Sequence, residues 1–189
     1  MAERSHLSWA KVRLAVLESS VLAVACLIAY LLATNLLSHA YFLSRADDLL
    51  GGMWAVIAAV FVLRDSYQRS MAAAVSRMAA TSVSFVICLL YLLFLPFNPF
   101  ALAVLIGVSA LTVTLIGRPG DAITAGITTA VVLVVAAVSP QNAWQQPILR
   151  FADTLIGVSV GIAAAWTDLR VVRPAMIRAK PDGGDISRL

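Results

Sequence analysis

Four arginines of this sequence stand next to long apolar segments, where a charged side chain is costly and usually serves a function. Their guanidinium groups could hold a small carboxylate by two parallel hydrogen bonds. The arginines recur with their polar neighbours in two series that share one spacing and are offset by 73 residues. The first series is Arg45, Asp48, Arg77 and Thr81, and the second is Arg118, Asp121, Arg150 and Thr154.

Two of the arginines are the predicted substrate contacts. Arg77 precedes Thr81, and Arg150 precedes Thr154, by four residues, so each pair lies on one face of a helix. Trp54 could stack on an aromatic substrate, although it could also simply pack in the core. We therefore predict substrate binding by Arg77, Arg150, Trp54, Thr81 and Thr154.

Aspartate follows three of the arginines at a distance of three residues, which allows an ion pair on one helical face. These pairs lower the cost of placing a charge near lipid, and Asp48 and Asp121 also occupy expected helix N-cap positions. Capped helix starts with local ion pairs are therefore the alternative to a substrate role. The predicted entrance or structural pairs are Arg45 with Asp48, Arg118 with Asp121, and Arg150 with Asp153.

Arg77 lacks such a neighbour, because Ala80 stands three residues after it. Its predicted partner is Glu18, about one turn inside the first apolar segment. Small residues continue the face of Arg150: Gly157 and Gly161 form a G-x-x-x-G pattern that allows close helix approach, so we predict a packing role for them.

Composition places the chain among integral membrane proteins. It is 61% hydrophobic and 13% charged, with a mean hydropathy of +0.90, whereas soluble domains carry about a quarter charged residues. The cysteines and histidines are isolated in the sequence, so we expect no metal site, no cofactor and no enzymatic activity. No folded basic domain is predicted, which argues against nucleic-acid binding.

Hydropathy predicts an all-α membrane protein with six transmembrane helices. An odd number of crossings in each half inverts the second half, so the offset of 73 residues predicts two inverted three-helix repeats. The alternative is a chance match between two helix starts. The predicted spans are 14–37, 49–63, 78–95, 100–116, 122–138 and 148–166, with the second helix continuing into the basic segment 64–77.

The domain prediction follows from these spans. Residues 1–172 are expected to form one transmembrane domain, with repeat 1 at 14–95 and repeat 2 at 99–166. Residues 173–189 have no apolar periodicity and are predicted to be a partly disordered cytoplasmic tail. Proline and glycine mark short turns at 96–99 and 117–120.

Positive charges predict the orientation. With the N-terminus inside, all of the fourteen lysines and arginines except Arg45 and Arg150 lie on the cytoplasmic side. Both termini are therefore predicted to be cytoplasmic, in the inner membrane of the cell.

Several residues resemble a known family. Gly52-Met53-Trp54-Ala55-Val56, the polar Arg64-Asp65-Ser66-Tyr67 and Arg77-Met78-Ala79-Ala80-Thr81 are similar to the pattern of the fusaric acid resistance proteins and aromatic acid exporters, which are in turn similar to plant aluminium-activated malate channels. Ala80 replaces a glycine of that pattern, and Arg150-Phe151-Ala152-Asp153-Thr154 echoes it. The resemblance implies six helices per unit, pairing into a homodimer, and passage of organic carboxylates.

These observations together predict an exporter of small, aromatic organic anions. A passive anion channel formed by a homodimer and a non-transporting membrane scaffold are the alternatives that the sequence leaves open. Neither the identity of the carboxylate nor a coupling ion follows from the residues.

Overall fold

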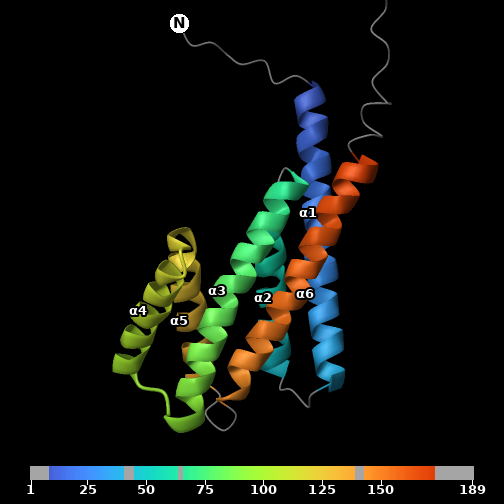
Figure 1. Cartoon of the computed structure of the whole chain (residues 1–189). Helices are drawn as coiled ribbons and strands as arrows, with labels where there is room; N and C mark the ends of the chain where they lie inside the picture. Colours follow the sequence, from blue (N-terminus) through green and yellow to red (C-terminus); the bar gives the residue numbers. More distant parts are fainter. Residues whose placement is uncertain (1–8, 41–44, 64–65, 139–142, 173–189) are drawn as a thin grey trace, which may run out of the picture.

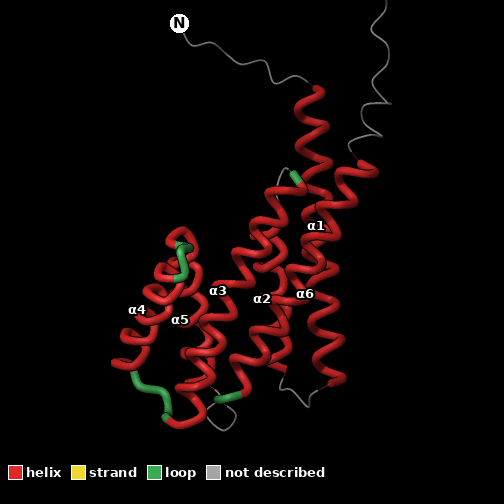
Figure 2. Tube along the Cα trace, in the orientation of Figure 1, coloured by secondary structure: helices red, strands yellow, loops and turns green. Residues whose placement is uncertain are grey.

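The computed structural model describes residues 9–40, 45–63, 66–138 and 143–172, and these ranges are helical with short connections and no strand (Figures 1 and 2). The all-α prediction is therefore confirmed. The elements in chain order are α1 (Trp9–Ala40), α2 (Arg45–Val62), α3 (Tyr67–Phe94), α4 (Pro99–Leu115), the 3₁₀ turn η1 (Pro119–Asp121), α5 (Ala122–Val138), α6 (Gln145–Thr167) and the π-helical turn η3 (Asp168–Val172).

Side-chain caps and one glycine determine where α3 and α4 begin and end. Ser66 precedes α3 and accepts a hydrogen bond from the Arg69 amide. Asn98 does the same for Phe100 at the start of α4, with Pro99 as its first residue, where the missing amide is not needed. Gly117 follows α4 with φ of 86°, a conformation that favours glycine. The turns predicted at 96–99 and 117–120 are confirmed.

The predicted extension of the second helix into residues 64–77 is wrong. α2 ends at Val62, and residues 67–77 form the first turns of α3. The cap at Ser66 explains the difference, because it starts a new helix eleven residues before the apolar segment that hydropathy detects. Arg77 consequently lies ten residues inside a 28-residue helix, about 15 Å from its start.

Four helical segments of the described chain are long and apolar enough to cross a membrane: 15–36, 67–94, 119–138 and 145–170. α4 is also apolar but has 17 residues, about 26 Å, slightly less than a hydrocarbon core of about 30 Å. α2 has 18 residues and carries Arg45, Asp47 and Asp48 in its first turn. The protein is thus a multi-pass membrane protein.

Successive helices run in alternating directions, and α3 and α6 lie side by side at the centre of the bundle and run in opposite directions (Figure 1). α2 packs on α6 and α1 packs on α2, while α5 packs on α3 and α4 packs on α5. α1 begins, and α6 ends, at the upper end in Figure 1.

The core between α1, α2 and α6 consists of small side chains. Ala29 and Ala33 of α1 face Ala55 and Ala59 of α2, and all four are buried. Small residues let helix backbones approach closely, which is how membrane helices gain packing energy in the absence of a strong hydrophobic effect. The result is a dense α1–α2–α6 contact, which holds the polar residues described next.

Candidate functional site

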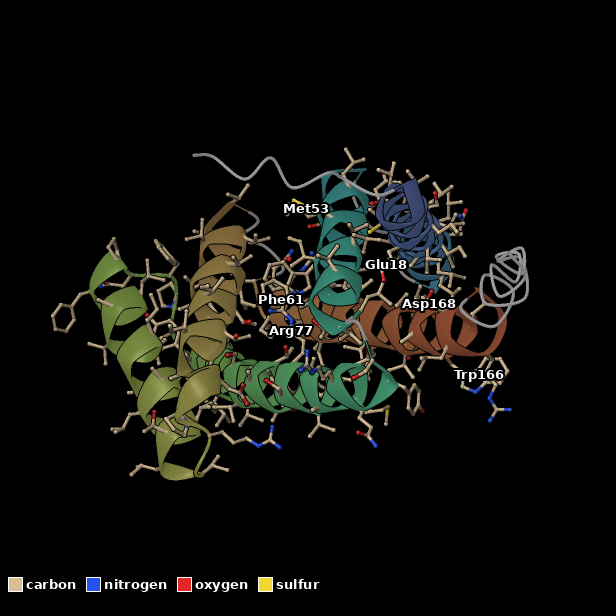
Figure 3. All side chains as sticks on the ribbon, turned by 90° about the horizontal axis from the view of Figure 1, so that it is seen from above. Glu18, Met53, Phe61, Arg77, Trp166 and Asp168 are labelled. Atoms are coloured by element: carbon tan, nitrogen blue, oxygen red, sulfur yellow. The ribbon has the colours of Figure 1, made fainter. Side chains whose placement is uncertain are left out.

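Arg77 is buried in the bundle and faces aromatic rings. Its side chain is 4% exposed, and its Cζ lies 5.2 Å from the ring centroid of Trp54 and 5.1 Å from that of Phe61, both on α2. Figure 3 shows Arg77 and Phe61 pointing toward one another. The Nε and Nη2 groups of Arg77 have no hydrogen-bond partner among the described residues. A cation with free donors is thus held against apolar rings.

Trp54 links the two arginines that the sequence selects. Its Nε1 donates to Thr154 Oγ1 at 3.0 Å, and the Thr154 hydroxyl donates to the Arg150 carbonyl at 2.8 Å. Arg77 stacks on the ring of the same tryptophan. The ring of Trp54 thus contacts the Arg77 guanidinium, and its Nε1 is joined through Thr154 to the backbone of Arg150, so residues of three helices meet at one buried indole. Thr81, one turn after Arg77, is also buried, and its hydroxyl has no partner among the described residues.

Arg150 differs from Arg77 in having a carboxylate beside it. Its Nη1 lies 3.1 Å from Asp153 Oδ2, and the side chains are 2% and 0% exposed. Asp153 faces Gly51 of α2, where a Cβ atom would stand 2.9 Å from Oδ1. Gly51 therefore makes the room that the carboxylate occupies. A fully buried pair of this kind costs several kcal/mol of desolvation for each ion, which the mutual attraction has to offset.

A hydrogen bond connects this pair to the first turn of α2. Gln146 lies one turn before Arg150 and is 1% exposed, and its Nε2 donates to Asp47 Oδ1 at 3.0 Å. Asp48, expected to cap this helix, instead lies within its first turn, because α2 begins at Arg45. The side chain of Arg45 lies outside the described residues, so the expected Arg45–Asp48 pair cannot be placed.

The expected ion pair between Glu18 and Arg77 is not formed. α2 and α6 lie between α1 and α3, and Arg77 faces Trp54 and Phe61 instead. Glu18 points toward Asp168 at the upper ends of α1 and α6 (Figure 3). The physical reason is the bundle order: α1 packs on the outer side of α2, where it does not reach the α3 face that carries Arg77.

Arg118 and Asp121 form a half-exposed ion pair at the turn before α5. Arg118 Nη1 is 3.3 Å from Asp121 Oδ2. Ser76 of α3 donates a hydrogen bond to the other oxygen of Asp121, Oδ1. Asp121 thus connects the start of α5 to α3 through Ser76, which is the residue before Arg77. This contact lies at a partly exposed end of the bundle.

Gly157 and Gly161 lie where α6 touches α2. A Cβ atom on Gly157 would collide with the Ala55 carbonyl oxygen and stand 2.7 Å from Ala58 Cβ, and one on Gly161 would stand 2.9 Å from Val62 Cβ. The missing side chains let α6 approach α2 closely enough for Thr154 to reach Trp54.

Three residues of the candidate site were not predicted as site residues from the sequence. Phe61 follows Trp54 by seven residues, two helical turns, so it could have been placed on the same face of α2. Gln146 likewise extends the face of Arg150 by one turn toward the start of α6. Gly51 left no comparable signal, because its contact with Asp153 depends on how α2 and α6 pack.

Other features of the described residues lie apart from this cluster. Among the described residues, no three His, Cys, Asp or Glu side chains lie close enough together to hold a metal ion. A shallow groove between α4 and α5 is lined by apolar residues, among them Ile106, Ala110 and Ile127. The groove offers no polar group to a charged ligand.

Comparison with known proteins adds one match. The family model described as fusaric acid resistance protein-like matches residues 39–164, about two thirds of the chain. The matched range contains all of α2 to α5 and most of α6, and therefore every residue of the cluster around Trp54. Searches of curated proteins and of solved structures found no match.

Proposed function

Because the chain belongs to the fusaric acid resistance protein-like family, a family of membrane transporters, we propose that it exports small organic carboxylate anions with aromatic bodies. The observation that carries this proposal is Arg77. It is a buried guanidinium with two donors unpaired among the described residues, and it stands in the matched region beside two aromatic rings.

The energetics of Arg77 favour an anionic ligand. Burying a cation costs several kcal/mol, while contact with an aromatic ring returns about 2 kcal/mol in a desolvated site. The two rings do not satisfy the Nε and Nη2 donors. A carboxylate would accept from both and supply the missing counter-charge.

The surroundings of Arg77 favour an aromatic body on that carboxylate. Trp54 and Phe61 present apolar ring surface next to the cation. Aromatic rings pair with each other in offset or edge-to-face arrangements worth about 0.5–1.5 kcal/mol beyond burial. Thr81, whose hydroxyl is unpaired among the described residues, stands one turn away and could bind a further polar group of the substrate.

We further propose that all six helices cross the inner membrane as two inverted repeats with both termini in the cytoplasm. The packing supports this arrangement, because exchanging α1, α2, α3 with α4, α5, α6 turns each major helix contact into another major contact. The alternating helix directions and the position of both described ends at one end of the bundle agree with it (Figure 1). The positive residues that the sequence predicts on the side of both termini support a cytoplasmic location for that side.

Two copies are proposed to pair in the membrane, as the resemblance to the family implies. Native mass spectrometry of the protein released from detergent gives the copy number directly. Detection of only the monomer at every concentration would refute the proposed homodimer. It would not affect the proposed site at Arg77, because that site is formed within one chain.

The test of transport uses proteoliposomes that contain the purified full-length chain and radiolabelled benzoate. We expect benzoate flux that is lost in Arg77→Gln and retained in Arg69→Gln, which removes the same charge from an exposed position on the same helix. Accumulation of benzoate against its own gradient under an imposed proton gradient identifies a coupled transporter, whereas purely downhill flux identifies a channel. Equal flux in both variants would refute the role of Arg77.

A further inference from the structure

The two arginines of the repeats differ in their own helices. Arg150 has Asp153 three residues later, whereas the residue at the same place after Arg77 is Ala80. Arg77 therefore keeps its positive charge without a carboxylate on its helix, and the charge of Arg150 is neutralised at 3.1 Å. Arg77 is therefore always available to bind an anion, whereas Asp153 controls whether the Arg150 guanidinium is available.

The carboxylate of Asp153 is held weakly for a fully buried anion. No described residue donates a hydrogen bond of good geometry to either oxygen, and the single ion pair reaches only Oδ2. Oδ1 rests against Gly51, which has no side chain to donate. Buried carboxylates that keep a charge normally accept two or three hydrogen bonds. Asp153 is thus placed where a bound proton would relieve an unfavourable charge.

The charged and titratable groups around Asp153 can be named for each helix packed on α6. On α6 itself the group is Arg150. From α2 they are Asp47, reached through Gln146, and Asp48 of the same turn. From α3 it is Arg77, on the other side of Trp54. From α1 it is Tyr30, which contacts Gly52, while Glu18 lies three turns farther along, about 18 Å away. α5 contains no charged residue.

We infer that Asp153 is the proton-binding residue of this transporter and that its protonation frees Arg150 to bind the organic anion together with Arg77. This inference rests on the proposed function. The proton comes from solvent and stays on the carboxyl oxygen, and no other bond changes. The Arg150 side chain then exchanges one carboxylate, that of Asp153, for another, that of the substrate.

The sign of the linkage follows from the charge count. With Asp153 ionised, the side chains of Arg77, Arg150 and Asp153 sum to one positive charge, and with Asp153 protonated they sum to two. An anion binds the second state more tightly, so by reciprocity anion binding must promote proton uptake. The anion and the proton therefore bind together and cross in the same direction, so outward movement of the anion follows its own gradient and carries a proton with it. Acidification on the side of binding strengthens the site.

The polar groups at the start of α6 suggest how a proton reaches this position. Asp47 accepts from Gln146, which precedes Arg150 by one turn, and Arg150 contacts Asp153. This row of polar residues begins at the first turn of α2 and leads into the bundle. It gives the proton a polar approach to a residue that is itself 0% exposed.

The experiment measures benzoate binding to the full-length protein in detergent by calorimetry between about pH 6 and pH 8, where benzoate remains ionised. For wild type we expect affinity to rise as pH falls, by at most about tenfold per pH unit for one linked proton. Benzoate added to weakly buffered protein should also raise the pH reported by an indicator dye. This second measurement needs no variant and holds even if a substitution at Asp153 prevents folding.

Two variants locate the proton. Asp153→Asn mimics the protonated state, so its affinity should match that of wild type at low pH and should not change with pH. Asp121→Asn, which alters the half-exposed pair with Arg118, should keep the pH dependence of wild type. His6 and His39 are unchanged in both variants, so a pH effect that they cause would persist in Asp153→Asn.

The outcomes separate the two proposals. Benzoate binding without proton uptake, or an unchanged pH dependence in Asp153→Asn, would overturn the role of Asp153 and leave the anion site on Arg77 standing. Absence of benzoate binding by wild type at every pH would overturn the proposed function and this inference with it.

Discussion

Substituting Gly157 with alanine tests the contact that brings Trp54 to Thr154. A Cβ atom at this position would collide with the backbone oxygen of Ala55 and stand 2.7 Å from Ala58 Cβ. Neither atom can rotate away, so α2 and α6 must separate. Overpacking of this kind costs about 1–3 kcal/mol, and we expect a value near the upper end because a backbone atom is involved.

The expected loss of stability in Gly157→Ala is the cost of overpacking minus the gain in helix propensity. Alanine is favoured over glycine inside a helix by about 0.5–1 kcal/mol, which leaves a net loss of about 2 kcal/mol. For a chain of this length, 1 kcal/mol corresponds to about 2–4 °C. We therefore expect the apparent Tm of Gly157→Ala in detergent to fall by about 4–8 °C, measured by tryptophan fluorescence on heating.

Gly107 provides the matched control. It lies inside α4, and a Cβ atom there would meet nothing within 4 Å. Gly107→Ala should gain helix propensity without a clash, so its apparent Tm should rise by about 1–4 °C. The reasoning is refuted if Gly157→Ala melts at or above the wild-type temperature while Gly107→Ala behaves as expected, because α2 and α6 would then not be in close contact.

Two further substitutions test the polar contacts inside the bundle. Trp54→Phe keeps a ring beside Arg77 and removes the bond to Thr154, so we expect a loss of about 0.5–1.5 kcal/mol in the free energy of unfolding, seen as a lower apparent Tm; an unchanged Tm would mean that this bond contributes nothing. Thr129 donates to Ser109 at 2.8 Å in the buried α4–α5 contact, and a double-mutant cycle with Ser109→Ala and Thr129→Val should give a coupling of about 0.6–1.7 kcal/mol from denaturation midpoints, whereas additive effects would contradict it.

The sequence determined the class of the protein and much of its local structure. Its apolar composition predicted a helical membrane protein, and proline, glycine and asparagine predicted the turns around α4, because these residues act through the backbone within a few positions. The pairs Arg118–Asp121 and Arg150–Asp153 were also readable, since residues three apart meet on any helix.

Only the tertiary structure decided which of these arginines keeps a hydrogen-bond donor without a partner among the described residues. Whether Arg77 meets Glu18 or two aromatic rings depends on α2 and α6 lying between α1 and α3, and periodicity within one helix contains no information about that order. The same holds for Gly51 against Asp153 and for Trp54 against Thr154, about 100 residues apart in the chain. These contacts form because close packing of small residues between α2 and α6 brings the buried polar groups within reach of each other.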